Sequence, residues 1–306
     1  MATEKGITLS GVCRQLGYSK QAYYKSLSRK KAATDQWQQI TQKVLSIRHQ
    51  LPRLGTRKLH KLLENDFKTQ GLKIGRDGLF TLLRKQSLLV ARKRKFVKTT
   101  DSRAWMRQYP NLVKSLEVVR PEQLWVADIT YLTTRQGYGY LHLITDAYSK
   151  KIMGYQLSDH LGASATLQAL QMAFKHRTSC QCLIHHSDRG LQYCSKEYTA
   201  LLKNNYVSIS MTQDGSPYDN AIAERVNGIL KQEFGLDEPF ETMKDAEKQI
   251  IEAVRLYDTL RPHLSNYLLT PQQMHCQHQL KPRAWHKKTT RTLKGPGGFL
   301  PSPPII

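Results

Sequence analysis

The 306-residue sequence has few cysteines and no long apolar run. Five cysteines, an odd and sparse count, fit reduced thiols and not a disulfide framework. No stretch of 18 apolar residues predicts a membrane-spanning helix, and the segment Met1–Lys5 does not open a secretory signal. We therefore expect a cytoplasmic protein without a membrane partner.

Acidic residues are scarce in the N-terminal third. Residues 1–110 contain 25 Lys and Arg against 6 Asp and Glu, a balance of +19 out of the total of +23. The remaining 196 residues contain 22 and 18, a balance of only +4. Lys and Arg neutralise phosphate, so this distribution favours a nucleic-acid partner over a solubilising surface or an anionic membrane.

A zinc site has weak support. Cys180 and Cys182 are followed by His185, His186 and Cys194. Cys-x-Cys on a strand places both thiols on one face without the usual spacing of zinc ligands, so packing thiols are favoured.

Three acids interrupt otherwise apolar elements. Asp128 lies within the β-rich segment 124–132, Asp188 ends the apolar run 182–188, and Glu224 lies in the first turns of a helix near 220–234. Desolvating a carboxylate is costly, so such acids call for a cation. Converging carboxylates suit Mg²⁺, and two such ions support attack on a phosphodiester.

The predicted helix at 220–234 places its acid opposite its apolar face. Glu224, Asn227 and Lys231 share the polar face, where Lys231 can meet phosphate. The apolar face consists of Ile222, Val226, Ile229 and Leu230.

Other polar residues compete for this site. We interpret Asp146 as a turn cap in preference to a fourth acid, and Asp219 or Asn220 as the cap of the Glu224 helix. His186 is either near the metal or a hydrogen-bonded structural residue. Arg189 either holds phosphate or screens Asp188.

These motifs resemble a known family. The 35 residues between Asp188 and Glu224, the basic residue seven after Glu224, and the phrases "WVADITYL", "HSDRGLQY" and "DNAIAER" are similar to retroviral-integrase-like DDE transposases. Within them, the chain resembles the second-frame (OrfB) protein of the IS-three family of insertion sequences, over roughly residues 7–275. "YDTLRPHLSNYLLTP" resembles the closing motif of the family, with Asp258 in place of the usual Asn and with His263 expected to lock the fold.

The resemblance implies a DNA transposase that cleaves a strand at the element's end and transfers it. Asp128, Asp188 and Glu224 would hold two Mg²⁺ ions, for which Mn²⁺ can substitute. The partners would be double-stranded DNA (terminal inverted repeats and target) and further copies of the chain. In a bacterium this places the chain in the cytoplasm, on the nucleoid. No sustained heptad precedes residue 100, so the chain is either one half that works with a first-frame OrfA protein, separate or fused, or a single-frame variant.

Periodicity predicts the core as three strands followed by alternating helices and strands, the order of a ribonuclease-H-like mixed five-stranded sheet in an α/β fold. The expected strands are 124–132, 139–146, 151–157, 182–188 and 206–210, and the expected helices are near 163–176, 195–204 and 220–234.

Before the core, the pattern predicts small all-α units. Two short helices between Thr8 and Lys31 form a helix-turn-helix or a plain helical hairpin, and leucine stripes in 34–90 indicate the core of a second unit. The expected segments are a helix-turn-helix (1–33), a second such unit (34–90), a basic linker (91–115), the catalytic core (116–277) and a basic, disordered tail (278–306). The residues expected to bind DNA are Lys20, Gln21, Arg57, Arg76, Arg92, Lys93, Arg94, Lys95, Arg189 and Lys231.

Two other functions fit part of the pattern. A ribonuclease-H-type nuclease would share the fold and metals but would not need 110 basic helical residues. A non-catalytic DNA-binding regulator would keep the basic arm but would tolerate losses among the three acids, which are all present.

Overall fold

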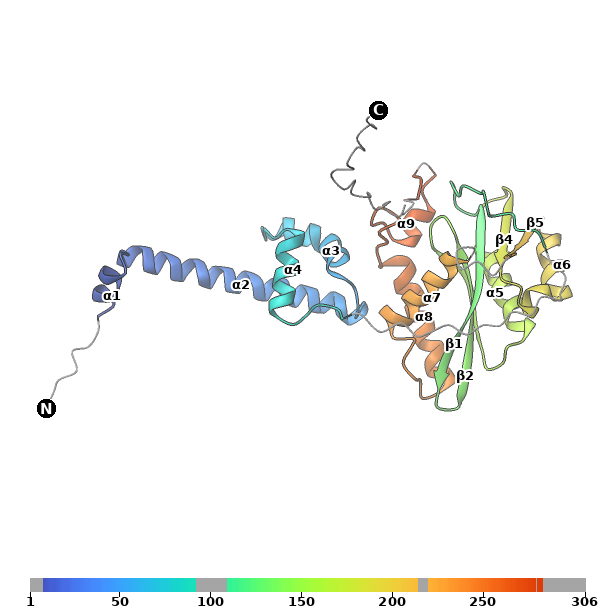
Figure 1. Cartoon of the computed structure of the whole chain (residues 1–306), viewed down its shortest axis with the longest axis horizontal. Helices are drawn as coiled ribbons and strands as arrows, with labels where there is room; N and C mark the ends of the chain where they lie inside the picture. Colours follow the sequence, from blue (N-terminus) through green and yellow to red (C-terminus); the bar gives the residue numbers. More distant parts are fainter. Residues whose placement is uncertain (1–7, 92–108, 214–219, 279, 283–306) are drawn as a thin grey trace, which may run out of the picture.

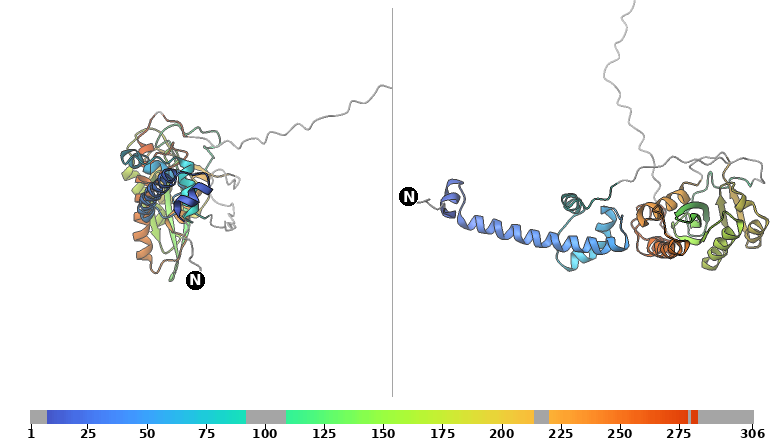
Figure 2. Two further views of the ribbon diagram at one scale, coloured as in Figure 1. Left: turned by 90° about the vertical axis from the view of Figure 1, so that its left-hand side faces the viewer. Right: turned by 90° about the horizontal axis from the view of Figure 1, so that it is seen from below.

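The computed structural model describes residues 8–91, 109–213, 220–278 and 280–282. A helical arm projects from an α/β body (Figures 1 and 2). The arm and its base contain α1 (Leu9–Gln15), α2 (Lys20–Gln50), α3 (Thr56–Thr69) and α4 (Arg76–Lys85). Within the described ranges, no helix combines the length and apolar character that a membrane span needs.

The body is built on a five-stranded sheet in the order β3-β2-β1-β4-β5. The β1–β2 and β2–β3 pairs are antiparallel, whereas β1–β4 and β4–β5 are parallel. This mixed sheet and the predicted element order are confirmed. The strands are β1 (Leu124–Thr134), β2 (Gly137–Asp146), β3 (Ile152–Ser158), β4 (Leu183–Ser187) and β5 (Val207–Met211).

Helices cover both faces of the sheet. On one face, Trp125 and Ala127 of β1 share a core with Ala169 and Leu170 of α5. On the other, Leu132 of β1 shares a core with residues of α7 and α8. Successive strand residues point to opposite faces, so Asp128 faces the same side as Leu132. The helices are α5 (Ala163–His176), α6 (Lys196–Asn204), α7 (Ala221–Phe234), α8 (Met243–Thr259) and α9 (Pro271–His275), with a short 3₁₀ turn η1 (Leu191–Cys194).

Helix α2 differs from the expectation. The sequence predicted a helix ending near Lys31, in a unit separate from residues 34–90, but α2 is continuous over 31 residues. The expected boundary between residues 33 and 34 therefore lies inside a helix. No glycine or proline occurs between Lys20 and Gln50, so nothing in the sequence breaks the hydrogen-bonded ladder.

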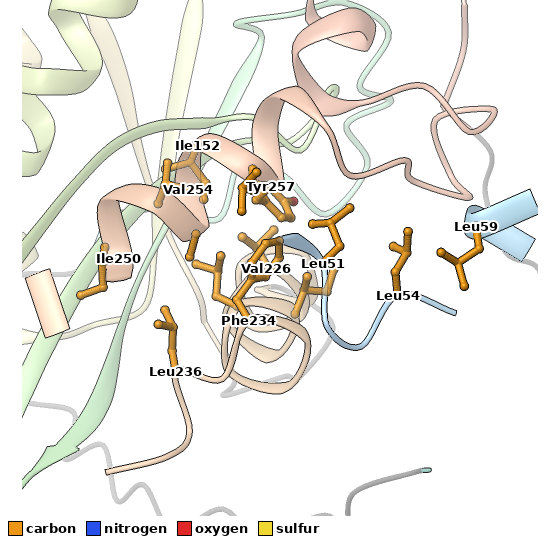
Figure 3. Packing of buried hydrophobic residues seen from close by; sticks show 14 of the residues in the cluster. Leu51, Leu54, Leu59, Ile152, Val226, Phe234, Leu236, Ile250, Val254 and Tyr257 are labelled. Carbon is orange, nitrogen blue, oxygen red and sulfur yellow. The ribbon is translucent and has the colours of Figure 1, made fainter. Parts of the chain in front are cut away.

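The base of the arm packs on the body. Ile40 and Val44 of α2 are fully buried against leucines of α3 and α4, which confirms those leucines as core. The same cluster continues into Val226 of α7 and Tyr257 of α8 (Figure 3). The helices at residues 34–90 and the α/β body therefore share one hydrophobic core.

Candidate active site and nucleic-acid interface

Asp128 and Asp188 lie at the same level of adjacent strands. The parallel pairing joins Trp125 to His185 and Val126 to His186, an offset of 60 residues (185 − 125 = 60). The printed pairs end at Val126 and His186, and the same offset continued by two residues would set Asp128 beside position 188, immediately after the end of β4 at Ser187. Neighbouring strands are about 4.8 Å apart, so the register brings these two acids to one end of the sheet.

Two asparagines, one in α7 and one at its N-terminus, reach β1 at Asp128. Asn227 Nδ2 donates a 2.7 Å hydrogen bond to Asp128 Oδ2, and Asn220 Nδ2 donates a 3.2 Å hydrogen bond to the Ala127 carbonyl. Glu224 precedes Asn227 by three residues, so the two side chains are neighbours on the helix surface. The face of α7 that packs on β1 is nevertheless the apolar one, because Val226 and Leu230 share a core with Leu132. Asn227 is buried at the edge of this face, so its predicted place on the opposite, polar face is wrong, while Glu224 and Lys231 are half-buried beside it.

Electrostatics support the same arrangement. Burial raises the pKa of the Tyr193 phenol well above its usual range, and the carboxylates of Asp188 and Asp128 raise it further. Burial lowers the pKa of Lys231, whereas the negative charges of Asp128 and Asp237 oppose this shift. Tyr193 is thus close to both aspartates, and the Lys231 ammonium is close to Asp128.

The side-chain oxygens near Asp128 suit a hard cation, although they do not form a complete set of metal ligands. Across residues 8–91, 109–213, 220–278 and 280–282, no group of three or more His, Cys, Asp or Glu is arranged to hold a metal ion. The side-chain oxygens of Asn220 and Asn227, both more than nine-tenths buried, find no hydrogen-bond partner among those residues. Carboxylates together with unsatisfied amide oxygens are the donors that Mg²⁺ and its bound waters use.

The competing acid and histidines have structural roles. Asp146 is fully buried, and its two oxygens accept hydrogen bonds from the backbone of Ser149 and Glu122, which confirms the turn cap. His186 is also fully buried, with Nδ1 2.8 Å from Ser210 Oγ, as in the structural interpretation. His263 is buried edge-on against Tyr257, which confirms its role in the fold.

The structure also describes Arg189 and the cysteines that were considered as zinc ligands. Arg189 Nε donates a 2.7 Å hydrogen bond to the Thr212 carbonyl, so this side chain also fastens the end of β5. The cysteines near residue 182 are free thiols, and no zinc cluster forms in the described part of the chain.

The prediction that the Asn220 side chain caps α7 is wrong. Asn220 occupies the position before the helix, but its side chain makes no capping hydrogen bond. Its amide group reaches across to β1 because the buried Ala127 carbonyl accepts from it. Asp219 lies outside the described residues.

The predicted DNA contacts fall into separate groups. Lys20 and Gln21 are exposed in the first turn of α2, at the far end of the arm. Arg57 and Arg76 come from different helices but line one hollow of about 440 Å³ at the base of the arm, together with Leu264 of the body. Arg92, Lys93, Arg94 and Lys95 lie outside the described residues.

Sequence reasoning missed the partners that hold these elements together. Asn227 was expected on the exposed polar face of α7, and neither its burial nor its bond to Asp128 was foreseen. Lys58 and Glu233 were not singled out, although they are joined by an ion pair of 3.2 Å across 175 residues. No local pattern signals a contact of this range.

Comparisons with known proteins agree with the fold and the motifs. Two family profiles, both described as "Integrase core domain", match residues 118–217 and 205–271. The chain is 33% identical over 257 residues to the "Insertion element IS600 uncharacterized 31 kDa protein" of Shigella sonnei, covering 82% of this chain and 93% of that protein. It is 31% identical over 229 residues to the "Transposase for insertion sequence element IS629" of Shigella sonnei, covering 72% and 75%.

Two further matches cover a smaller part of this chain. The "Transposase InsF for insertion sequence IS3A" of Escherichia coli K12 is 34% identical over 172 residues, covering 56% of this chain and 60% of that protein. Among solved structures, the HTLV-2 integrase catalytic core domain in complex with magnesium is 18% identical, with a TM-score of 0.42, and covers 51% of this chain and 98% of that one. Together, the integrase-core profiles and the extended identity to insertion-element proteins establish that the chain belongs to the IS3 family of insertion-sequence transposases, enzymes with an integrase catalytic core.

Proposed function

We propose that this chain cleaves one DNA strand at each end of an insertion sequence and joins the freed 3′-hydroxyl to target DNA. The observation that supports the proposal is the pairing register of β1 and β4, which continued by two residues would set Asp128 level with Asp188. The Asn227–Asp128 hydrogen bond adds support, because Glu224 lies one helical turn before Asn227. Asp128, Asp188 and Glu224 would be the metal ligands.

The reaction is two in-line displacements at phosphorus. In the first, a water oxygen forms a bond to phosphorus and the 3′-oxygen leaves; in the second, this 3′-hydroxyl attacks a target phosphodiester, so one such bond forms as one breaks. Two Mg²⁺ ions, replaceable by Mn²⁺, would activate the attacking oxygen and stabilise the leaving oxygen. No serine, tyrosine or cysteine nucleophile is required.

The protein's own residues orient this chemistry. Asn227 fixes one oxygen of Asp128 by donating to it, so the other oxygen keeps a defined direction. Lys231, on the same helix face and near Asp128, would neutralise a DNA phosphate. Arg189, already oriented by its bond to Thr212, is a second candidate for phosphate contact.

The proposed partners follow from charge and family. The basic arm would bind the terminal inverted repeats, and Arg57 and Arg76 would grip one stretch of backbone phosphates at its base. We propose that the chain works as a homo-oligomer on DNA, with a first-frame OrfA protein, in the bacterial cytoplasm. The ligands of the metals, the DNA contacts and these partners are open to direct test.

The test is a nicking and joining assay on duplexes that carry an element end, with and without the first-frame protein. Wild type is expected to nick and join with Mg²⁺ or Mn²⁺ and to do neither in EDTA. Asp128→Asn, Asp188→Asn and Glu224→Gln should lose both steps while they keep end binding. Glu247→Gln removes an exposed carboxylate from α8 and should behave as wild type.

Three results would count against the proposal. Activity in EDTA would reject the metal mechanism, and joining by Glu224→Gln would move the third ligand to another acid. Nicking without any joined product would favour a ribonuclease-H-type nuclease.

A further inference from the structure

A buried charge cluster connects the base of the arm to the helix that carries Glu224. Glu233 of α7 accepts two hydrogen bonds from Arg261, at 2.8 Å from Nε and 2.7 Å from Nη2. Its Oε1 is also 3.2 Å from Lys58 Nζ of α3. The side chains of Lys58, Glu233 and Arg261 are only 12%, 19% and 1% exposed, so the cluster is shielded from water.

Apolar packing surrounds this cluster. Leu51 and Leu54, in the turn between α2 and α3, are 2% and 1% exposed and lie in the same cluster as Val226 and Phe234 of α7 (Figure 3). Apolar burial supplies attraction without direction, whereas a buried ion pair tolerates few geometries. The apolar contacts therefore hold the two units together, and the charges can define how they are aligned.

The energetics of the cluster point to alignment more than to stability. Burial lowers the pKa of Lys58 to about 8, and the positive charge of Arg261 adds to this effect against the attraction of Glu233. Burial alone would raise the pKa of Glu233, but the hydrogen bonds and charges of Arg261 and Lys58 outweigh it and lower that pKa. Two cations share one carboxylate, and buried ion pairs of this kind are often no more stabilising than apolar replacements.

We propose that Lys58 and Glu233 are positioning residues that fix the DNA-binding helices α3 and α4 relative to the active site, so that cleavage falls on a single phosphate. The proposal rests on the proposed function. Arg57, next to Lys58, and Arg76 line the hollow at the base of the arm, and Glu233 follows Glu224 on one rigid helix. DNA held by the two arginines is thereby set at a constant distance from the carboxylates.

The test compares Lys58→Met with Lys61→Met. Both variants remove one charge from α3, but Lys61 is half exposed and pairs with Glu64 of its own helix. On element-end DNA, we expect Lys58→Met to bind within about threefold of Lys61→Met. Its cuts, mapped at nucleotide resolution, should spread to neighbouring phosphates, with at least a tenfold loss of rate at the wild-type position. Lys58→Arg, which keeps the charge, should restore most of the single cut.

A second measurement tests how firmly α3 is held against the body and does not depend on catalysis. Amide hydrogen exchange over residues 51–59, without DNA, should be faster in Lys58→Met than in Lys61→Met. An inactive wild type would reject the proposed function, yet this comparison would still decide whether Lys58 fixes the two units.

If Lys58→Met does not fold, Glu233→Asp takes its place, because it keeps the charge that buried Arg261 needs but withdraws the carboxylate from Lys58. The proposal is overturned if the folded variant cuts only at the wild-type phosphate at the control rate, or if its hydrogen exchange matches that of the control.

Discussion

At the scale of single residues, Asp258 carries an electrostatic cost that its neighbours only partly relieve. The side chain is 8% exposed, and its Oδ1 accepts a 3.1 Å hydrogen bond from the Ile152 amide. Burial raises its pKa to about 7, against the lowering effects of that hydrogen bond and of nearby Lys151 and His275. The closing motif that this segment resembles has Asn at this position, which would accept the same hydrogen bond without a charge.

Asp258→Asn should therefore stabilise the protein in a pH-dependent way. The folded pKa lies above the unfolded one, so Asp258 lowers stability progressively as pH rises from about 4 to about 7, and by a constant amount above that. At about 1.4 kcal/mol per pKa unit, the gain on substitution is at most about 4 kcal/mol above pH 7. Thermal melts of both proteins from pH 4 to pH 8 measure it, and a gain independent of pH would contradict this account.

His275 has the opposite pH dependence. Its Nε2 lies 3.5 Å from Glu122 Oε1, and its Nδ1 lies 3.6 Å from Asp146 Oδ1. Burial alone would lower the pKa of His275, but the nearby carboxylates of Asp146 and Glu122 outweigh it and raise the pKa to about 9. The charged imidazole therefore fastens α9 to the turn capped by Asp146.

His275→Gln should destabilise the protein most at low pH. A raised pKa contributes stability that is complete below about pH 6.5 and is lost as pH rises through about 9. We expect a loss of roughly 2–3 kcal/mol at pH 6 and a much smaller one at pH 9.5, measured by urea unfolding at both values. Equal losses would mean that His275 acts through packing alone.

At the scale of elements, the arm and the body differ in how they are stabilised. Between Lys20 and Gln39 of α2 no residue is buried, whereas α3 and α4 bury leucines in the shared core. The outer part of α2 therefore depends on its own helix-forming residues and on the contact with α1. A local break there should not spread into the body.

Ala32→Pro tests this separation. Ala32 is exposed in the middle of α2, and proline there costs the helix about 3 kcal/mol. We expect the main thermal transition to be unchanged, while the part of the DNA footprint due to the end of the arm is lost. Ala32→Gln keeps the helix and should leave both unchanged. A lowered main transition for Ala32→Pro alone would show that the arm stabilises the body.

The elements also show how far the sequence could be interpreted. The strands and helices of the core were predictable to within about two residues, because alternation and helical periodicity each report burial on one face. Asp128 and Asp188 could be assigned to the sheet, since Asp128 interrupts one apolar strand and Asp188 ends another. The continuity of α2 was missed because its polar middle, Lys30–Asp35, has no apolar period although it contains no helix breaker.

Contacts between distant elements could not be predicted. The Lys58–Glu233 pair and the Asn227–Asp128 bond join residues 175 and 99 positions apart. Periodicity reports that a side chain is buried but not which element covers it. The capping role expected of Asn220 failed for the same reason, because the nearby strand offered its amide a buried carbonyl.

At the scale of the whole molecule, charge is the dominant feature. The net charge of +23 is concentrated in the first 110 residues, and the predicted DNA-binding side chains described in α2, α3 and α4 are exposed. If six to ten of the 25 Lys and Arg residues in this segment contact phosphates, affinity for duplex DNA should fall about 10³- to 10⁵-fold between 50 and 200 mM salt. Fluorescence anisotropy of the full chain on an end duplex measures this slope.

A double variant tests whether Arg57 and Arg76 contribute to this salt dependence. Arg57→Gln with Arg76→Gln should reduce the slope of log K against log salt by about two, because each lost phosphate contact removes about one. Lys175→Gln with Lys203→Gln removes the same charge from exposed positions on α5 and α6 and should change the slope little. Equal slopes for the two double variants would show that the base of the arm does not contact the backbone.

The unbroken length of α2 also sets a spacing on DNA. From Lys20, at the end of the arm, to Ile40, where the helix enters the shared core, there are 21 residues, or about 30 Å of helix. One turn of duplex spans about 34–36 Å, or 10–10.5 base pairs. A contact at the end of α2 and a contact at its base can thus meet the same side of a duplex, nearly one turn apart. The length of α2 would then fix the distance between the two DNA contacts. An end sequence with five base pairs inserted between them would present the second contact site on the opposite side of the duplex.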